Sequence, residues 1–81
     1  MKKDKFRIFL RNDAGNDRMN VDIEFDGEIL AEMFEEAGNV NLFIHSCPKG
    51  DREFWVFDHQ ELIDVLQKAR DSLMEANASA K

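Results

Sequence analysis

The sequence predicts a single α+β domain: a tandem β-β-α repeat that forms a four-stranded, mainly antiparallel sheet with two helices on one face. Short runs alternate between apolar and polar residues, and two later segments carry apolar residues at helical spacing. The two halves of the chain also align with each other. A chain of 81 residues has room for one domain. We place this domain at residues 1–76, with pseudo-repeats at 6–38 and 40–76 and a disordered tail at 77–81.

The first half contains two expected strands and one expected helix. Residues 6–10 form a short β-like run, and residues 21–25 alternate cleanly between apolar and acidic side chains. Residues 26–38 then carry a helical pattern that begins at Asp26, a good N-cap, and stops at Gly38. The apolar residues at helical spacing are Ile29, Leu30, Met33, Phe34 and Ala37.

The second half follows the same plan. Residues 40–45 and 53–57 are expected strands, joined by a turn around Pro48 and Gly50. Residues 58–76 are an expected longer helix that opens with Asp58 and Glu61, an acidic variant of the capping box. In the alignment of the halves, Phe25, Asp26 and Leu30 correspond to Phe57, Asp58 and Leu62. Gene duplication and the general likeness of capped helices both explain this match.

Two helices on one side would leave the other face of the sheet uncovered. Alternation places four apolar side chains on that face, bordered by charged residues such as Arg7 and Arg11; the four are Phe9, Phe43, Phe54 and Val56. An aromatic patch with a charged rim is typical of an interaction surface, and homodimerisation is its simplest use. The alternatives are a face covered by the chain itself and apolar residues that are exposed singly.

The net charge of −6 is unevenly distributed, because no Lys or Arg occurs between Met19 and Pro48. The candidate acidic binding residues all lie in this stretch: Asp22, Glu24, Glu28, Glu32, Glu35 and Glu36. The four glutamates from Glu28 onward form an acidic stripe along the expected helix at residues 26–38. Three uses remain open. The carboxylates keep a small protein soluble, they attract a basic protein partner, or they mimic the phosphates of a nucleic acid.

We therefore expect a small acidic non-enzymatic interaction module, acting as a regulator, inhibitor or adaptor of a protein partner that is basic or nucleic-acid-binding. The alternative is a phage-type anti-defence inhibitor, anti-CRISPR or anti-restriction, whose carboxylates mimic a nucleic-acid backbone. The chain resembles that class in composition only. A distant alternative is a small enzyme that uses Cys47 with His45 or His59, although no orienting group or oxyanion site is indicated.

Composition argues against several other classes. An acidic chain does not neutralise phosphates, so we expect no direct nucleic-acid binding. One cysteine and two histidines fall short of a closed Cys/His metal site, and we expect no metal and no cofactor. No apolar run approaches the length of a membrane span, and no signal-peptide core follows the N-terminus. These features predict a cytoplasmic protein with no membrane partner.

Overall fold

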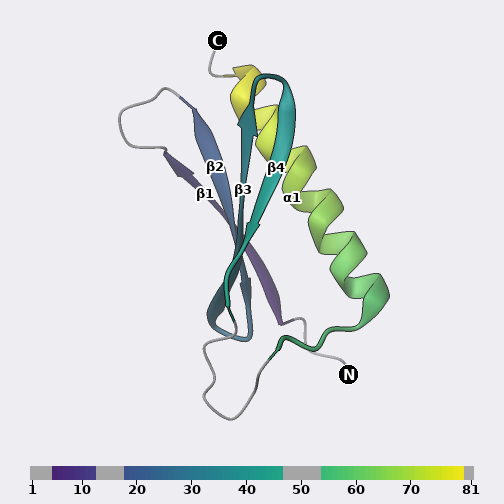
Figure 1. The fold of residues 1–81 in the computed structure, drawn as a ribbon. Helices are drawn as coiled ribbons and strands as arrows, with labels where there is room; N and C mark the ends of the chain where they lie inside the picture. Colours follow the sequence, from purple (N-terminus) through teal and green to yellow (C-terminus); the bar gives the residue numbers. More distant parts are fainter. Residues whose placement is uncertain (1–4, 13–17, 47–53, 80–81) are drawn as a thin grey trace.

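The computed structural model describes residues 5–12, 18–46 and 54–79. These residues form two layers, a four-stranded sheet and a single long helix that crosses one of its faces (Figure 1). The α+β class predicted from the sequence is confirmed. The elements are β1 (Phe6–Asn12), β2 (Met19–Phe25), β3 (Glu28–Glu36), β4 (Asn39–Ile44) and α1 (His59–Ser79).

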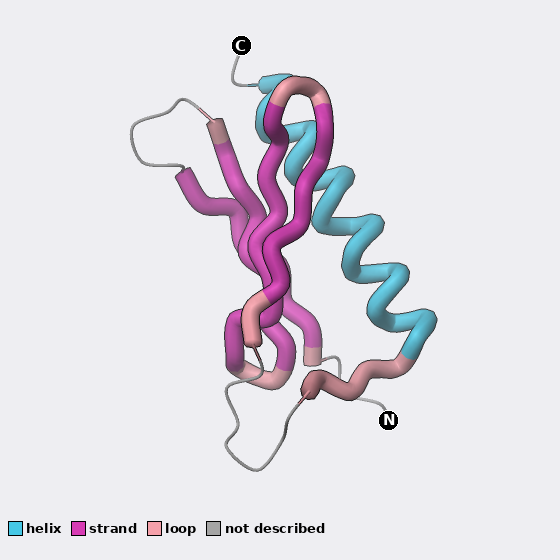
Figure 2. The backbone as a smooth tube through the Cα atoms, in the orientation of Figure 1, coloured by secondary structure: helices cyan, strands magenta, loops and turns pink. Residues whose placement is uncertain are grey.

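The sheet is an antiparallel meander in which each strand pairs with the next, in the order β1-β2-β3-β4. The strands β1 and β4 are therefore the two edges. The helix α1 packs against β1, β2 and β3, and Figure 2 shows it running along one side of the twisted sheet. The opposite face, here called the uncovered face, is the one turned away from α1.

The core lies between α1 and the sheet. Val21 and Ile23 of β2 meet Ala69 and Leu73 of α1, and all four are fully buried. The alternation in β2 explains this arrangement, because every second side chain points to the helix. The remaining buried apolar residues of the core are Phe6, Leu30, Ala31, Met33 and Val65.

Four aromatic rings close one end of the core. The Phe25 ring lies 4.8 Å from Phe6 and 4.7 Å from Phe57, between ring centroids, and Trp55 stacks on Phe57 at 6.0 Å. The Trp55 indole Nε1–H donates a hydrogen bond of 2.9 Å to the backbone oxygen of His45. That bond satisfies the indole donor and ties the segment before α1 to the end of β4.

The helix α1 has the N-cap that the sequence predicts. The Asp58 carboxylate accepts a 3.0 Å hydrogen bond from the backbone N–H of Glu61. The C-terminal end differs from the prediction, because the helix continues to Ser79 and Asn77 does not belong to a disordered tail. The buried Asn77 side chain bonds the backbone of Met19 and the Glu35 carboxylate, and these bonds hold the last turn against the sheet.

The predicted helix at residues 26–38 is wrong, because residues 28–36 form the strand β3. Two tight turns enclose it, Asp26–Gly27 and Ala37–Gly38, and all four residues have positive φ. Two-residue hairpins of type I′ require this backbone, and Asp-Gly is their strongest sequence signal. Asp26 and Gly38 of these turns are also residue types that favour a helix N-cap and a helix stop, which accounts for the wrong prediction.

A bulge in β3 explains the helix-like spacing. Ile23 pairs with Ala31 whereas the next residue, Glu24, pairs with Ile29, so Leu30 is an extra residue in β3. The buried positions consequently run Leu30, Ala31 and Met33 instead of alternating strictly. Leu30 and Met33 are then three positions apart and both buried, which is the spacing expected on one face of a helix.

The predicted fourth strand at residues 53–57 is also wrong in the part that the structure describes. Residues 54–58 alternate in exposure as a strand would, but they form no ladder with the sheet. Their inward side chains, Trp55 and Phe57, join the aromatic cluster at the end of the core. With one helix and this irregular segment, the tandem β-β-α repeat and the pair of helices on one face are not confirmed.

Candidate protein-binding face

The uncovered face contains every second residue of the four strands. Its members follow from the strand register and from the burial of their neighbours on the opposite, helix-covered side. Most are charged, polar or aromatic. The uncovered face comprises Arg7, Phe9, Arg11, Asn20, Asp22, Glu24, Ile29, Glu32, Phe34, Glu36, Asn39, Asn41, Phe43 and, just after β4, His45.

One row of directly paired residues crosses all four strands. Phe9 of β1 pairs with Asp22 of β2, Asp22 with Glu32 of β3, and Glu32 with Phe43 of β4. The row therefore has a phenyl ring at each end and carboxylates in the middle. Three strand spacings separate the two rings, on the order of 14 Å.

A hydrogen-bonded network holds the middle of the row. Arg11 donates from Nε to both carboxylate oxygens of Asp22, at 3.0 and 3.2 Å, and from Nη2 to Glu32 Oε1 at 2.8 Å. The other Glu32 oxygen, Oε2, lies 2.7 Å from His45 Nε2. Every carboxylate oxygen of the two central acids thus has a partner. The network joins one residue from each of β1, β2 and β3 with His45, the residue after β4.

The two rings at the ends of the row differ in their surroundings. Phe43 is 59% exposed and lies edge-on to the His45 imidazole, at 5.4 Å between ring centroids. Phe9, at the other edge, is 43% exposed. His45 is itself fixed from the backbone side, because its carbonyl oxygen accepts the Trp55 hydrogen bond. The polar centre is consequently more constrained than the exposed rings on either side of it.

The structure separates the predicted apolar patch into two parts. Phe9 and Phe43 lie on the uncovered face as expected, but at opposite edges and not as one cluster. Phe54 and Val56 lie outside the sheet, in the segment before α1, where they are 66% and 62% exposed. They were placed on this face only because residues 53–57 were expected to be a strand.

The predicted acidic residues are likewise divided. Asp22, Glu24, Glu32 and Glu36 lie on the uncovered face, so the acidic stripe of a helix does not exist. The remaining two lie elsewhere. Glu28 pairs with Phe25 beside the first tight turn. Glu35 lies on the helix side, where its carboxylate accepts a hydrogen bond from Asn77 and forms an ion pair with Arg18 at 3.5 Å.

Sequence reasoning missed the roles of Arg11 and His45. The sequence pattern places Arg11 at the rim of the face and suggests a role for His45 only together with Cys47. A strand at residues 28–36 would have placed Glu32 between them, because the pairing of Glu32 with Asp22 and Phe43 then follows from the register. The Asp26–Gly27 dipeptide was the available signal.

The Cys/His alternative stays a prediction, because Cys47 lies outside the described residues. His59 begins α1, and His45 bonds Glu32. Within the described ranges, no three His, Cys, Asp or Glu side chains come together in a way that could hold a metal ion.

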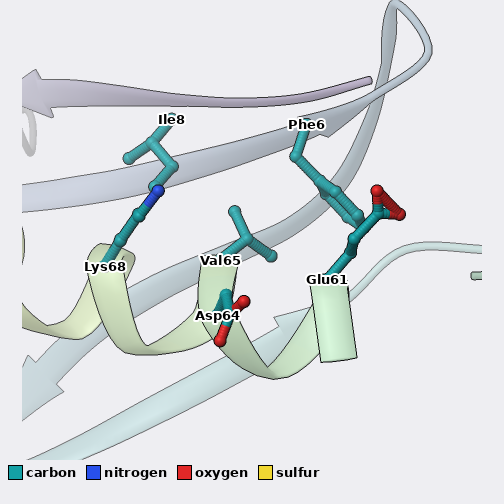
Figure 3. A pocket seen from close by; sticks show the side chains of 6 residues that line it. All are labelled: Phe6, Ile8, Glu61, Asp64, Val65 and Lys68. Carbon is teal, nitrogen blue, oxygen red and sulfur yellow. The ribbon is translucent and has the colours of Figure 1, made fainter. Parts of the chain in front are cut away.

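A shallow hollow of about 270 Å³ lies on the helix side, between β1 and α1. Figure 3 shows Phe6 and Ile8 of β1 above Val65 of α1, with charged side chains around them. Those charges belong to Glu61, Asp64 and Lys68. The hollow is the open side of the core beside an edge strand, and its charged groups point along its rim without converging on one position.

Comparison of the chain with protein-family models, with curated proteins and with solved structures found no match to any of them. Among the described residues, no helix has both the length and the apolar character that crossing a bilayer requires.

Proposed function

We propose that the chain is a small non-enzymatic interaction module that binds a protein partner through the uncovered face. The observation that carries the proposal is the row Phe9–Asp22–Glu32–Phe43, in which a fully bonded polar centre lies between two exposed phenyl rings. Exposed aromatic residues around constrained polar groups are characteristic of binding surfaces.

The network contributes to binding by fixing the shape of the surface. Hydrogen bonds to the carboxylates of Asp22 and Glu32 restrict the Arg11 side chain. The two carboxylate oxygens of Glu32 are in turn held by Arg11 and by His45. A partner then meets side chains that are already ordered, and less conformational entropy is lost on association. These hydrogen bonds form within the chain itself and do not require the partner.

The same bonds bear on the chemistry of the partner. Because Arg11 and His45 occupy the oxygens of Asp22 and Glu32, the centre of the face is not a row of free carboxylates. This arrangement favours anchoring by Phe9 and Phe43 over docking by charge. The fitting partner has two apolar recesses on the order of 14 Å apart, with polar groups between them. Mimicry of a nucleic-acid backbone receives less support, since its carboxylates would have to remain unpaired.

The test compares capture of proteins from the native host by the wild type, by Phe9→Ala, by Phe43→Ala and by Phe54→Ala. Phe54 is the control, because it is a phenylalanine outside the sheet that is at least as exposed as Phe9 and Phe43. A protein that wild type and Phe54→Ala capture is then purified and titrated against all four. We expect each of the other two substitutions to weaken binding at least about tenfold, as for an interface anchor.

Salt distinguishes the two modes of docking. Anchoring by phenyl rings predicts a dissociation constant that changes little when the ionic strength is raised, whereas docking on carboxylates predicts a steep loss of affinity. Equal binding by wild type, Phe9→Ala and Phe43→Ala would contradict the proposal. Circular dichroism of each variant verifies that the fold is retained.

A further inference from the structure

The two edges of the sheet differ in charge. The β4 edge, Asn39–Ile44, has no charged residue and no proline, and Leu42, Phe43 and Ile44 are all exposed. The β1 edge carries Arg7 and Arg11. Proteins usually protect an edge strand from pairing by placing charges on it. Only β1 has this protection.

The open side of β4 presents unpaired backbone groups. The N–H of His45 donates to the Leu30 oxygen in β3, so the N–H groups of Val40, Leu42 and Ile44 point the other way. No described residue outside β3 forms a ladder with β4. These donors and acceptors form a template for another strand.

An apolar groove of about 320 Å³ lies beside this edge on the helix side. Val40 and Leu42 form its β4 wall. The wall from α1 consists of Ile63, Leu66, Gln67 and Arg70. No carboxylate lines the groove, although the chain carries a net charge of −6. A strand added to β4 would place every second side chain next to this groove.

We infer that the occupant of the β4 edge is a second copy of this chain. Two β4 strands pair antiparallel about a two-fold axis, and the two sheets join into one of eight strands. With the axis beside Leu42, Leu42 of one copy lies opposite Leu42 of the other and Val40 lies opposite Ile44, all on the groove side. On the uncovered side, Asn41 of one copy lies opposite Phe43 of the other. A strand that pairs with the β4 edge should be uncharged and carry aliphatic side chains at alternate positions. The strand β4 itself has both properties.

The charges also explain why assembly stops at two copies. Pairing of β1 with another β1 about a two-fold axis at Phe9 would set Arg7 of one copy opposite Arg11 of the other, and like charges directly opposite destabilise a strand pair. The assembly is therefore a closed dimer with a β1 edge at each end. Because it uses the backbone edge of the sheet, the inference does not rest on the proposed function of the uncovered face, although Phe43 belongs to both surfaces.

The small contact between two β4 strands predicts a low affinity for the dimer. A stable complex involves about 20–30 residues on each partner, whereas β4 has six. We expect a dissociation constant on the order of 10 μM. Sedimentation equilibrium of the full chain from about 1 μM to about 1 mM covers both sides of this value.

The test variant is Leu42→Lys, and Leu10→Lys is its control. Both leucines are on edge strands and on the helix side, with exposed fractions of 40% and 49%, so neither change disrupts the core. A lysine at position 42 lies beside its symmetry mate, and we expect the dissociation constant to rise at least about 100-fold. Leu10→Lys should dimerise as the wild type does.

Hydrogen exchange tests the same contact without substitution. The amides of Val40, Leu42 and Ile44 should exchange slowly at about 1 mM and quickly at about 1 μM, whereas amides in β1 should not depend on concentration. A wild type that stays monomeric at about 1 mM overturns the inference. So do a dimer that Leu42→Lys leaves intact, equal weakening by both variants, and growth beyond two copies.

Discussion

The substitution Gly27→Ala separates the hairpin found at residues 25–28 from a helix start at the same place. Gly27 has φ of +85°, and a β-carbon added there meets no atom within 4 Å. Any effect therefore comes from the backbone alone. An alanine in this left-handed conformation costs about 1–2 kcal/mol, and about 0.4–1 kcal/mol of this is offset because alanine restricts the unfolded chain. The net loss of stability is about 1 kcal/mol.

Urea unfolding measures the sign of this change. With a slope of about 1 kcal/mol per molar for a small domain, the midpoint should fall by about 1 M. In a helix the same substitution would stabilise the protein by up to about 1 kcal/mol, because alanine is the better helix former. A midpoint that rises would refute the hairpin and the strand β3 that follows it.

The turn at Ala37–Gly38 supplies a second variant of opposite sign. Ala37 has φ of 52°, in the left-handed region where asparagine is tolerated better than alanine. Ala37→Asn should increase the free energy of unfolding by about 0.5 kcal/mol and therefore raise the urea midpoint. In the last turn of a helix, asparagine would instead lower the midpoint by a similar amount.

Three further substitutions, with Met74→Ala as a control, test the packing of α1 and the network on the uncovered face. Leu73→Ala should lower the free energy of unfolding by about 3–5 kcal/mol, because this side chain is fully buried. Met74→Ala, at an exposed neighbouring position, should lower it by less than about 1 kcal/mol. Thermal melts of the two variants measure the difference. Asn77→Ala should cost about 1–3 kcal/mol in urea unfolding, because it leaves the Met19 backbone without its buried partner, and a neutral result would show that the end of α1 does not dock. Arg11→Ala should cost only about 1 kcal/mol in stability, because its ion pairs are partly exposed, yet it should weaken partner binding, and calorimetric titration would measure that loss.

Much of the sheet and all of the start of α1 could be predicted from local patterns. The alternation in β2 sets which residues face the core, and the Asp58 cap sets where the helix begins. Both features depend on neighbours in the sequence. The end of α1 could not be predicted in this way, because Asn77 is held by Met19 and Glu35, which are distant in the chain.

The strand β3 was missed for two reasons, one non-local and one local. Leu30 is an extra residue opposite β2, and the bulge exists only through that pairing. The residues of β3 are also good helix formers, so propensity and spacing pointed to the same wrong element. Tertiary pairing outweighed both. The candidate site depended on this strand, since the position of Glu32 between Arg11 and His45 follows from the register of β3.

The most direct test of the binding face is a chemical-shift map of the isotope-labelled chain, titrated with the partner that the capture experiment identifies. Binding through the uncovered face predicts the largest changes at Phe9, Asp22, Glu32 and Phe43, with little change along the outer surface of α1. Changes centred on α1, with the row across the four strands unaffected, would contradict it.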